Sequence, residues 1–317
     1  MVKQSIKSTN YKKLSVSLIA TVLNELQSIE AFLDSYKQQT LLASQFIIVD
    51  AGSTDGTAQL IEKFAKKNRL LKIELVVLEN STRGQARNAA VAKAKGEWLA
   101  FTDAGCVLES DWLEQLVMEQ VHSQQQVVGG WFRGLAQSRL QEAMVPYFLQ
   151  LPRQLSTKNF IPTSRSLLIS KKAFDTVRGF KEELILSEDY DLMLRLRAEK
   201  ISWALARRAI VNWFPPKNYR TFLWKIAAFA ASDIEAGIVR PKVLSIYGRY
   251  LVFLTVSIWS ISLAVLLLLL YFSWSIIKNY HNCPDAWYYL PFLQFSTDMA
   301  IMVASLFAIR NFNSRVA

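Results

Sequence analysis

The sequence predicts an α/β domain with a mostly parallel central sheet, followed by two transmembrane helices. Three observations support this prediction. Apolar runs alternate with helical patterns through the first 120 residues, which is typical of βαβ units. Two of these runs end in an aspartate, at Asp50 and Asp103, at the strand ends where an open α/β sheet binds its ligand. Two apolar stretches, each long enough to cross a bilayer as a helix, lie near the C-terminus.

The hydrophobic pattern places the expected elements in chain order. The run at 46–50 is apolar up to its last residue and is bounded by turn residues, which indicates a buried parallel strand. Gly52 and Gly56 allow a tight turn after it, and Asp55 or Thr57 can cap the helix that begins near residue 58. The full set comprises strands at 14–22, 46–50, 73–78, 98–102 and 167–169, and helices at 29–38, 58–67, 83–94, 111–120 and after the acidic pair at 188–189.

The strand end at Asp50 has the chemistry of a nucleotide site, because a carboxylate there can accept hydrogen bonds from a base or a ribose. The dinucleotide fingerprint G-x-G-x-x-G and the phosphate loop G-x-x-x-x-G-K-[ST] are both absent. Their absence argues against NAD and against the ATP of a P-loop enzyme. The alternative is that Asp50 and Asp55 only cap a helix.

The segment Val49 to Thr57, VDAGSTDGT, resembles the V-D-D-G-S-x-D-G-T strand end of family-2 glycosyltransferases, which have a GT-A fold. The resemblance covers roughly residues 15 to 213. It implies an enzyme that binds a nucleotide-diphosphate sugar. The donor-nucleotide site is then expected at Thr21, Glu25, Asp50, Arg87 and Asp103. For Arg87 the alternative is an ordinary arginine on a helix surface.

A metal site is also implied by the resemblance, because the family carries an Asp-x-Asp motif where Asp103-Ala104-Gly105 lies. The later aspartate is generally the metal contact, and here that position is Gly105. Asp103 is therefore the predicted ligand of a divalent cation, Mg²⁺ or Mn²⁺, which would neutralise the leaving diphosphate. How the cation is held without the second aspartate is left open by the sequence.

The acceptor side is implied by Ser187-Glu188-Asp189, which matches the family's acidic pair at the start of a helix. Asp189 is the predicted base, and Glu188 is a supporting or acceptor-binding carboxylate. The alternative is a helix N-terminus that is merely enriched in acids. Arg165 precedes the strand at 167–169, where the family builds part of its acceptor side, and is expected to meet a phosphate of the donor or the acceptor.

The C-terminal part predicts a membrane region. No charged residue lies between Tyr250 and Leu270, and a second apolar stretch contains one acid, Asp298. The expected division is a catalytic domain over 1–217, an interfacial amphipathic helix over 218–242, and a membrane region over 243–317 with spans at about 250–272 and 287–309. An ordinary domain helix is the alternative for the interfacial one.

The placement of basic residues orients the predicted spans. Cations precede the first span and follow the second, whereas the connection at 275–286 contains only Lys278 as a fixed cation. By the positive-inside rule, the catalytic domain and the C-terminus face the cytoplasm and the connection lies outside. The sequence thus predicts a multi-pass protein of the inner cell membrane, and no export signal is found at the N-terminus.

Net charge and cysteine count limit the classes of binding partner and metal site that are expected. The net charge of +11 over 317 residues suits an anionic lipid surface and phosphate-bearing substrates, and no nucleic-acid partner is expected. Cys106 and Cys283 are too few for a disulfide framework or a cysteine metal cluster.

These observations predict an inverting glycosyltransferase that moves a sugar from a nucleotide-diphosphate sugar to a hydroxyl of a glycan or lipid-linked acceptor. A polyprenyl-phosphate glycosyltransferase, with a lipid phosphate as acceptor, is one alternative. A membrane-tethered nucleotide-sugar binder that has lost catalysis is another, suggested by Gly105. The sequence does not name the sugar, the nucleotide, the acceptor, the linkage or the oligomeric state.

Overall fold

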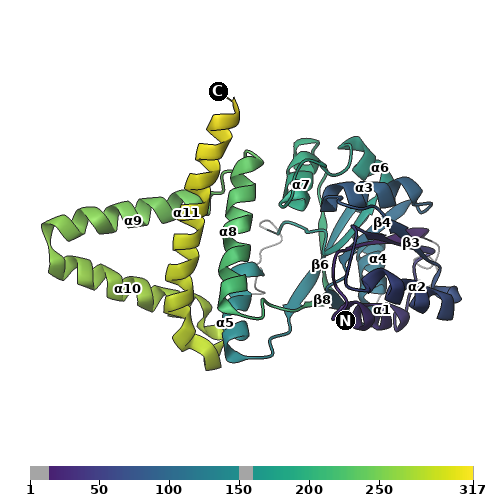
Figure 1. The fold of residues 1–317 in the computed structure, drawn as a ribbon, viewed down its shortest axis with the longest axis horizontal. Coiled ribbons are helices and arrows are strands. Elements are labelled where there is room, and N and C mark those ends of the chain that lie inside the picture. The colour runs from purple at the N-terminus through teal and green to yellow at the C-terminus, as the bar shows by residue number, and fades with distance from the viewer. Residues whose placement is uncertain (1–13, 150–159, 317) are drawn as a thin grey trace, which may run out of the picture. The chain divides into compact units, whose positions relative to one another are not determined.

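The computed structural model describes residues 14–149 and 160–316, and the side chains up to residue 308. The chain divides into two units, Met1–Arg133 with Leu155–Trp213, and Gly134–Gln154 with Phe214–Ala317. The first unit carries the β-sheet and the second is helical (Figure 1). Each unit is described by itself.

The first unit is built on an eight-stranded sheet with the order β3-β2-β1-β4-β7-β6-β8-β5. Strands β3, β2, β1 and β4 are parallel, as predicted, whereas β7 pairs antiparallel with β4 and β6, and β5 with β8. The strands are β1 Val16–Val22, β2 Gln45–Asp50, β3 Ile73–Val77, β4 Trp98–Asp103, β5 Cys106–Leu108, β6 Val127–Gly134, β7 Ser166–Ser170 and β8 Ala204–Trp213.

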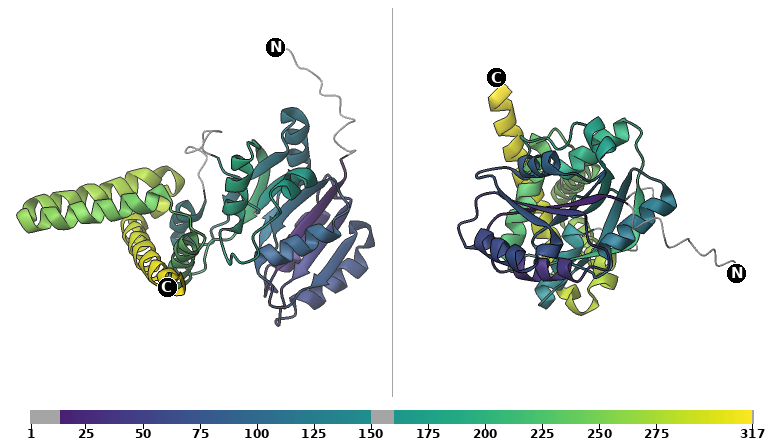
Figure 2. Two further views of the ribbon diagram at one scale, coloured as in Figure 1. Left: turned by 90° about the horizontal axis from the view of Figure 1, so that it is seen from above. Right: turned by 90° about the vertical axis from the view of Figure 1, so that its right-hand side faces the viewer.

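Helices cover both faces of this sheet (Figure 2). Neighbouring residues of β1 point to opposite faces, so Leu18 and Ile19 belong to different apolar clusters and are both fully buried. This two-sided burial explains why the parallel strands read as continuous apolar runs. The helices of this unit are α1 Ile29–Lys37, α2 Thr57–Lys67, α3 Arg83–Lys93, α4 Trp112–Ser123, α6 Lys171–Thr176 and α7 Glu188–Ala198, with a 3₁₀ turn at Arg69–Leu71.

The strand register brings the predicted acids to one edge of the sheet. In the parallel pairing, Val22 of β1 lies beside Asp50 of β2, and Thr21 lies beside Asp103 of β4. The carboxyl ends of the three strands therefore meet, which is the location predicted from the sequence.

The predicted cap of α2 is wrong. Gly56 is the N-cap residue, with a φ of +96° and no side-chain cap. Asp55 instead accepts hydrogen bonds from the backbone N–H groups of Leu26 and Thr57, each at 3.0 Å. It thereby ties the loop after β1 to the loop after β2.

The sequence pattern missed β5, β6, β8, α5 and α6. In β6 the reason is a glycine pair, Gly129-Gly130, which suggests an irregular connection. A side-chain carbon at Gly130 would lie 1.9 Å from Oγ of Ser166 and 2.7 Å from the carbonyl oxygen of Ala209. These glycines therefore allow close approach of neighbouring strands and do not mark a loop.

The second unit is helical and differs from the predicted membrane region. Its elements are α5 Arg139–Phe148, α8 Tyr219–Glu235, α9 Pro241–Trp259, α10 Ile261–Asn279, 3₁₀ turns at Tyr280–Asn282 and Pro284–Tyr289, and α11 Leu290–Val316. The stretch predicted as one span at about 250–272 is divided by a helix break at Ser260 into the end of α9 and the start of α10. Ser260 has an extended backbone, and its side chain accepts a hydrogen bond from the N–H of Leu263, so it caps the new helix.

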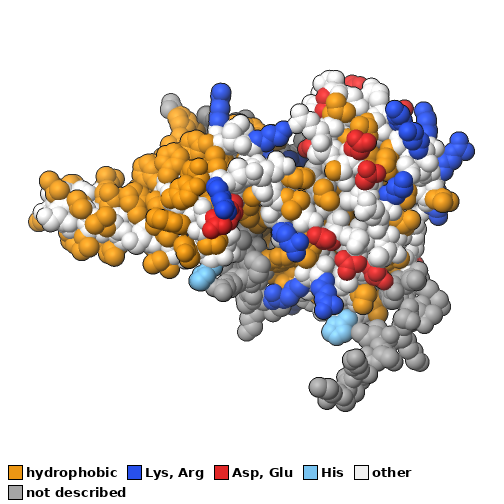
Figure 3. All heavy atoms as spheres, turned by 90° about the horizontal axis from the view of Figure 1, so that it is seen from below, with side chains coloured by type: hydrophobic (Ala, Val, Ile, Leu, Met, Phe, Trp, Pro, Cys, Tyr) orange, Lys and Arg blue, Asp and Glu red, His pale blue; other side chains and the backbone are white. Residues whose placement is uncertain are grey.

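Two segments are long and apolar enough to cross a membrane, Ile261–Asn282 and Pro284–Ala308. The share of side chains buried within the protein is 11% for the first and 44% for the second, so only the first is largely uncovered. Figure 3 shows hydrophobic side chains over the end of this unit formed by α9 and α10. The second segment lies in α11, which packs along α8.

The connection at 275–286, predicted to lie across the membrane from the catalytic domain, is fixed to α5 within the second unit. Arg139 of α5 forms an ion pair with Asp285 at 2.8 Å, and the hydroxyl of Tyr147 donates to the carbonyl of Leu290 at 3.2 Å. Helix α5 follows β6 after a few residues, too few to cross a bilayer. These contacts fix the connection to α5, and its side of a membrane stays a prediction.

Candidate active site

The centre of the candidate site is Arg87, on the second turn of α3. Its side chain is buried, with 2% of the residue exposed. One guanidinium nitrogen, Nη1, donates to Oε1 of Glu188, and the other, Nη2, donates to Oδ1 of Asp103 at 3.0 Å. Arg87 therefore joins the end of β4 to the start of α7, two segments 85 residues apart in the sequence (188 less 103).

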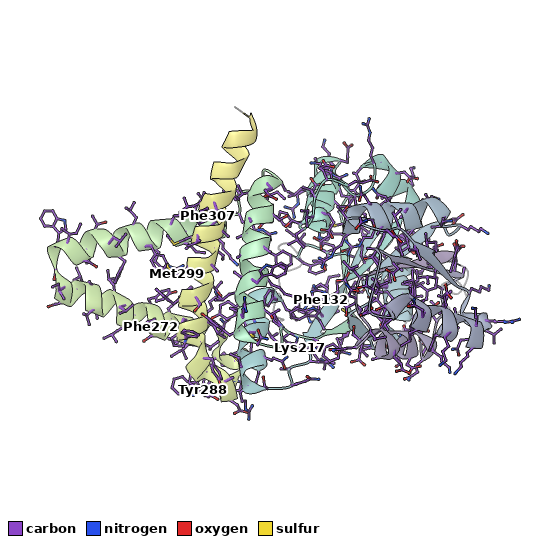
Figure 4. The ribbon with its side chains drawn as sticks, viewed as in Figure 1. Phe132, Lys217, Phe272, Tyr288, Met299 and Phe307 are labelled. Atoms are coloured by element: carbon purple, nitrogen blue, oxygen red, sulfur yellow. The ribbon has the colours of Figure 1, made fainter. Side chains whose placement is uncertain are left out.

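Asp103 is held from a second direction by Arg165. The Nε atom of Arg165 lies 3.4 Å from Oδ2 of Asp103. Its guanidinium also lies over the rings of Phe132 and Trp213, at 5.6 and 5.2 Å from their centroids; Phe132 of β6 is labelled in Figure 4. Aromatic faces attract a cation, so they fix this guanidinium beside Asp103.

The two acids at the start of α7 have different surroundings. Glu188 is buried, with 3% of the residue exposed, and its carboxylate pairs with Arg87. Asp189 is half-buried, and its Oδ1 accepts a hydrogen bond from the N–H of Tyr190 at 2.8 Å. The preceding Ser187 has a φ of +62°, a left-handed conformation that is uncommon for residues other than glycine and is often found at functional sites.

The pKa values of Asp103 and Asp189 are shifted in opposite directions by their surroundings. Burial by itself would raise the pKa of Asp103, but Arg87 and Arg165 outweigh it and hold this pKa below its usual range. At Asp189, burial and the negative charge of Glu188 raise the pKa above its usual value, although Arg87 opposes the shift. Asp103 therefore stays ionised, while Asp189 has a greater tendency to take up a proton.

Asp50 lies beneath the turn that follows β2. Its exposed fraction is 0%, and its Oδ1 accepts hydrogen bonds from the N–H groups of Gly52 at 2.8 Å and Ser53 at 2.7 Å. Its other oxygen, Oδ2, has no hydrogen-bond partner among the described residues. Oδ1 of Asp50 therefore shapes this turn, and the direct nucleotide contact expected from the sequence stays a prediction.

Glu25 lies beside the position where the expected second aspartate is missing. A side-chain carbon at Gly105 would be 3.2 Å from Oε1 of Glu25. The Glu25 carboxylate also accepts a hydrogen bond from the hydroxyl of Ser28, and its backbone N–H donates to Oγ1 of Thr57 at 3.0 Å. The Glu25 carboxylate thus lies next to the turn that follows Asp103.

The carboxylates of Glu25 and Asp103 fit a divalent cation that takes its remaining ligands from the enzyme's substrate. Mg²⁺ is commonly held by one or two carboxylates together with phosphate oxygens, and Glu25 and Asp103 both lie at the Asp103–Cys106 turn. No group of three or more His, Cys, Asp and Glu side chains that could hold a metal by itself occurs among the described residues. A cation here would need the diphosphate of the donor to complete its ligands.

The loop before α7 is fixed against α3. The side chain of Asn88 donates to the carbonyl of Phe180 at 2.8 Å and accepts from its N–H at 3.0 Å. The hydroxyl of Thr82 donates to the carbonyl of Glu182 at 2.8 Å, and a side chain on Gly84 would lie 2.7 Å from the carbonyl oxygen of Lys181. These contacts position Glu188 and Asp189 relative to Arg87.

The sequence matches the family described as glycosyl transferase family 2 over residues 17–178, just over half of the chain. The chain belongs to this family. The matched region contains Asp50, Arg87, Asp103 and Arg165, and the family prediction made from the strand-end motif is confirmed.

Among curated proteins, glycosyltransferase AglE of Haloferax volcanii is 33% identical over 119 residues, which are 36% of this chain and 38% of AglE. The first four curated relatives are matched over only 29% to 41% of their own length.

Solved structures confirm the GT-A-like fold. Mannosyltransferase PcManGT from Pyrobaculum calidifontis, in complex with GDP-Man and Mn²⁺, aligns with a TM-score of 0.62 and 18% identity over 92% of this chain and 87% of that one. S. aureus TarS 1–349 in complex with UDP-GlcNAc aligns with a TM-score of 0.53 and 19% identity, over 69% and 66%.

The structure brings Glu25, Arg87, Asp103, Arg165 and the acidic pair into one unit, and Thr21 lies beside Asp103 on β1. Sequence reasoning did not find that Arg87 is a buried bridge between the two acidic segments. The only signal was its position four residues after Arg83 in an alanine-rich helix, where small residues allow the helix to pack closely.

The Arg87 bridge predicts a strong dependence of stability on this residue. Replacing Arg87 by Ala leaves the Glu188 carboxylate buried without its partner, which is expected to cost about 3–5 kcal/mol of unfolding free energy. The matched control is Arg133→Ala, which breaks an exposed pair with Glu109 and should cost less than about 1 kcal/mol. Thermal unfolding followed by circular dichroism compares them, and equal shifts would contradict a buried bridge.

Proposed function

We propose that the protein transfers a sugar, with inversion, from a nucleotide-diphosphate sugar to an acceptor hydroxyl. The observation that carries this proposal is the position of Asp189: a half-buried carboxyl with a raised pKa, next to the Glu188–Arg87–Asp103 chain of ion pairs. A base with a pKa nearer to neutral transfers protons more efficiently at physiological pH. Family membership supports the same reaction class.

The roles of the other residues follow from their contacts. Asp189 takes the proton of the acceptor hydroxyl as its oxygen attacks the anomeric carbon from the face opposite the diphosphate. Glu188 holds Arg87 and raises the pKa of Asp189 through its charge. Arg165, with its guanidinium held between two aromatic rings, is available to a phosphate of the donor or acceptor.

Glu25 and Asp103 would hold a divalent cation, Mg²⁺ or Mn²⁺, together with the donor diphosphate. When bound, the cation stabilises the negative charge of the leaving group. The bound Mn²⁺ and GDP-Man of PcManGT and the bound UDP-GlcNAc of TarS support a nucleotide-sugar donor and a cation. The two structures hold different donors, so the proposal names the class of donor and neither its nucleotide nor its sugar.

The acceptor is proposed to be a glycan or lipid-linked molecule at the cytoplasmic face of the cell membrane, where nucleotide sugars are available. The apolar segments of the second unit support membrane association. A lipid phosphate as acceptor is already ionised and needs no base, so the contribution of Asp189 to turnover distinguishes the two acceptor classes.

The central test is Asp189→Asn, which keeps the size of the side chain but removes the base. Turnover is expected to fall by about two to four orders of magnitude, while donor affinity measured by calorimetry barely changes. Asp191→Asn is the matched control in the same helical turn, because Asp191 pairs with Lys181 and Arg195 and is expected to affect stability more than turnover. Full activity of Asp189→Asn would contradict a hydroxyl acceptor and favour a phosphate one.

The charge of Glu188 predicts a shift in the pH profile. The base must be deprotonated, so the rate falls as the pH drops through the raised pKa of Asp189. Glu188→Gln removes a negative charge that raises this pKa, so the acidic limb of kcat/KM should move to lower pH. Glu183→Gln, at an exposed position on the preceding loop, is the control and should leave the limb in place. A limb that moves upward in Glu188→Gln would show that Asp189 is not the titrating base.

The shared cation site predicts similar defects in two variants. Asp103→Asn and Glu25→Gln should each weaken Mn²⁺ binding in the presence of nucleoside diphosphate, measured by calorimetry, because each removes one negatively charged ligand. Glu79→Gln, on the loop after β3, serves as a control for the loss of a surface charge. Unchanged Mn²⁺ affinity in Glu25→Gln would leave Asp103 as the single protein ligand.

A further inference from the structure

The second unit contains an apolar helical hairpin whose shape differs from that of two separate spans. Helices α9 and α10 meet at Ser260 and diverge from this tip toward α11 (Figure 1), with contacts between the two helices. The side chains at the tip are among the most exposed apolar groups of the described chain: Ile258 at 83%, Trp259 at 86% and Ile261 at 78%. No described residue of this unit covers them.

Short segments connect both ends of the hairpin to strands of the sheet. Helix α9 follows α8, which begins a few residues after β8. Helix α10 leads into the turns at 280–289, which are fixed to α5 by the Arg139–Asp285 pair and by an apolar cluster that includes Ala286, Met144 and Ala143. Since α5 directly follows β6, the hairpin enters and leaves from the side of the sheet.

The uncharged length of the hairpin matches one leaflet. Above the level where Arg249 meets Tyr271, each arm has ten residues, 250–259 and 261–270, and none of them is charged; the uncharged stretch of α10 continues to Ile277. Ten residues at about 1.5 Å each reach about 15 Å, which is half of a hydrocarbon core of about 30 Å. The tip of a hairpin inserted to this depth lies at the middle of the bilayer.

The residues at the base of these arms are suited to the headgroup region. Arg249 pairs with Asp298 at 2.9 Å, and its guanidinium lies 5.1 Å from the ring centroids of both Tyr271 and Trp274. The Nζ atom of Lys278 also lies over the ring of Trp274, at 4.9 Å from its centroid. Tyr and Trp side chains favour this interface, and lysine and arginine attract anionic lipids.

Helix α11 does not cross the bilayer beside this hairpin. It packs along α8, where the hydroxyl of Tyr219 donates to Ser296 at 2.7 Å. Helix α8 carries Arg220, Lys225 and Glu235, so a transmembrane α11 would take these charges into hydrocarbon, where charged side chains are strongly disfavoured. In the structure the hairpin projects from this helix pair (Figure 1).

We propose that α9 and α10 form a re-entrant hairpin that inserts into a single leaflet, with Ser260 near the bilayer centre, and that α8 and α11 lie at the membrane surface. The lipid of that leaflet covers the exposed apolar side chains of the hairpin. Its assignment to the cytoplasmic leaflet rests on the proposed function, whereas the depth and the one-sided entry do not. The hydroxyls of Ser257 and Ser260 make local hydrogen bonds, to the carbonyl of Phe253 at 2.7 Å and from the N–H of Leu263 at 3.3 Å, which suits a lipid environment.

The test places a fluorescent probe at the tip of the full-length chain. Ser260→Cys is labelled with an environment-sensitive fluorophore and reconstituted into vesicles of phosphatidylcholine and phosphatidylglycerol that carry nitroxide lipids, either at the headgroup or near the end of the acyl chain. We expect the deep nitroxide to quench the probe more strongly. Ser245→Cys, four residues before Arg249 on α9, is the matched control and should be quenched more by the headgroup nitroxide. Both native cysteines are buried, so the unchanged chain reports background labelling.

Three outcomes overturn the proposal. Stronger quenching of the 260 probe by the headgroup nitroxide, with labelling by an impermeant maleimide from the far side, would show a hairpin that crosses both leaflets. Labelling from the near side only would show a hairpin lying along the surface, and no quenching by either lipid would show that a protein surface covers it. Donor binding, measured on the same preparation, tests the proposed function separately because the substituted residues lie outside the sheet-containing unit.

Discussion

The buried guanidinium of Arg87 is the interaction on which the candidate site depends. It pairs with Glu188 at the start of α7 and with Asp103 at the end of β4, and its own exposed fraction is 2%. A buried cation is tolerated when its charge is balanced and its donors are bonded. Two acids therefore balance one arginine, and the arginine fixes Asp103 and Glu188 relative to each other.

This arrangement separates the properties of three neighbouring carboxyl groups. Asp103 lies between two arginines, which hold its pKa below the usual range, whereas burial and the charge of Glu188 raise the pKa of Asp189. One ionised acid suits a cation and phosphate site, and one readily protonated acid suits a base. Asp103 and Asp189 are the same residue type, so the difference between their pKa values arises from their surroundings: two guanidinium groups at Asp103, burial and the charge of Glu188 at Asp189.

Much of the fold was predictable from the sequence, because a strand buried on both faces is apolar along its length and a parallel unit repeats strand and helix. The positions of Asp50 and Asp103 at adjacent strand ends followed from the same pattern. The ion pair of Arg87 with Glu188 could not be predicted, since it joins residues 101 positions apart through a tertiary contact. The hydrogen bonds from the Gly52 and Ser53 N–H groups to Asp50 could not be predicted either, since they depend on the geometry of the turn after β2.

The membrane region shows a similar limit. Hydropathy over 250–270 cannot distinguish one span from two shorter arms, because the break at Ser260 is a capped turn between residues that are all uncharged. The position of the following connection depends on the Arg139–Asp285 pair, which joins distant parts of the chain. The length of the uncharged stretch therefore indicated membrane contact. The course of the chain after the stretch depends on tertiary contacts that the sequence pattern does not contain.

A double-mutant cycle on unfolding free energy tests the Arg87 bridge most directly. Asp103→Asn and Glu188→Gln each leave Arg87 with one acid, whereas the double variant leaves the buried guanidinium without either. The loss in the double variant is therefore predicted to exceed the sum of the two single losses by at least about 1 kcal/mol, beyond the 0.3–0.5 kcal/mol scatter typical of independent sites. Losses that add within that scatter would show that the two acids are not coupled through Arg87, and would contradict the account.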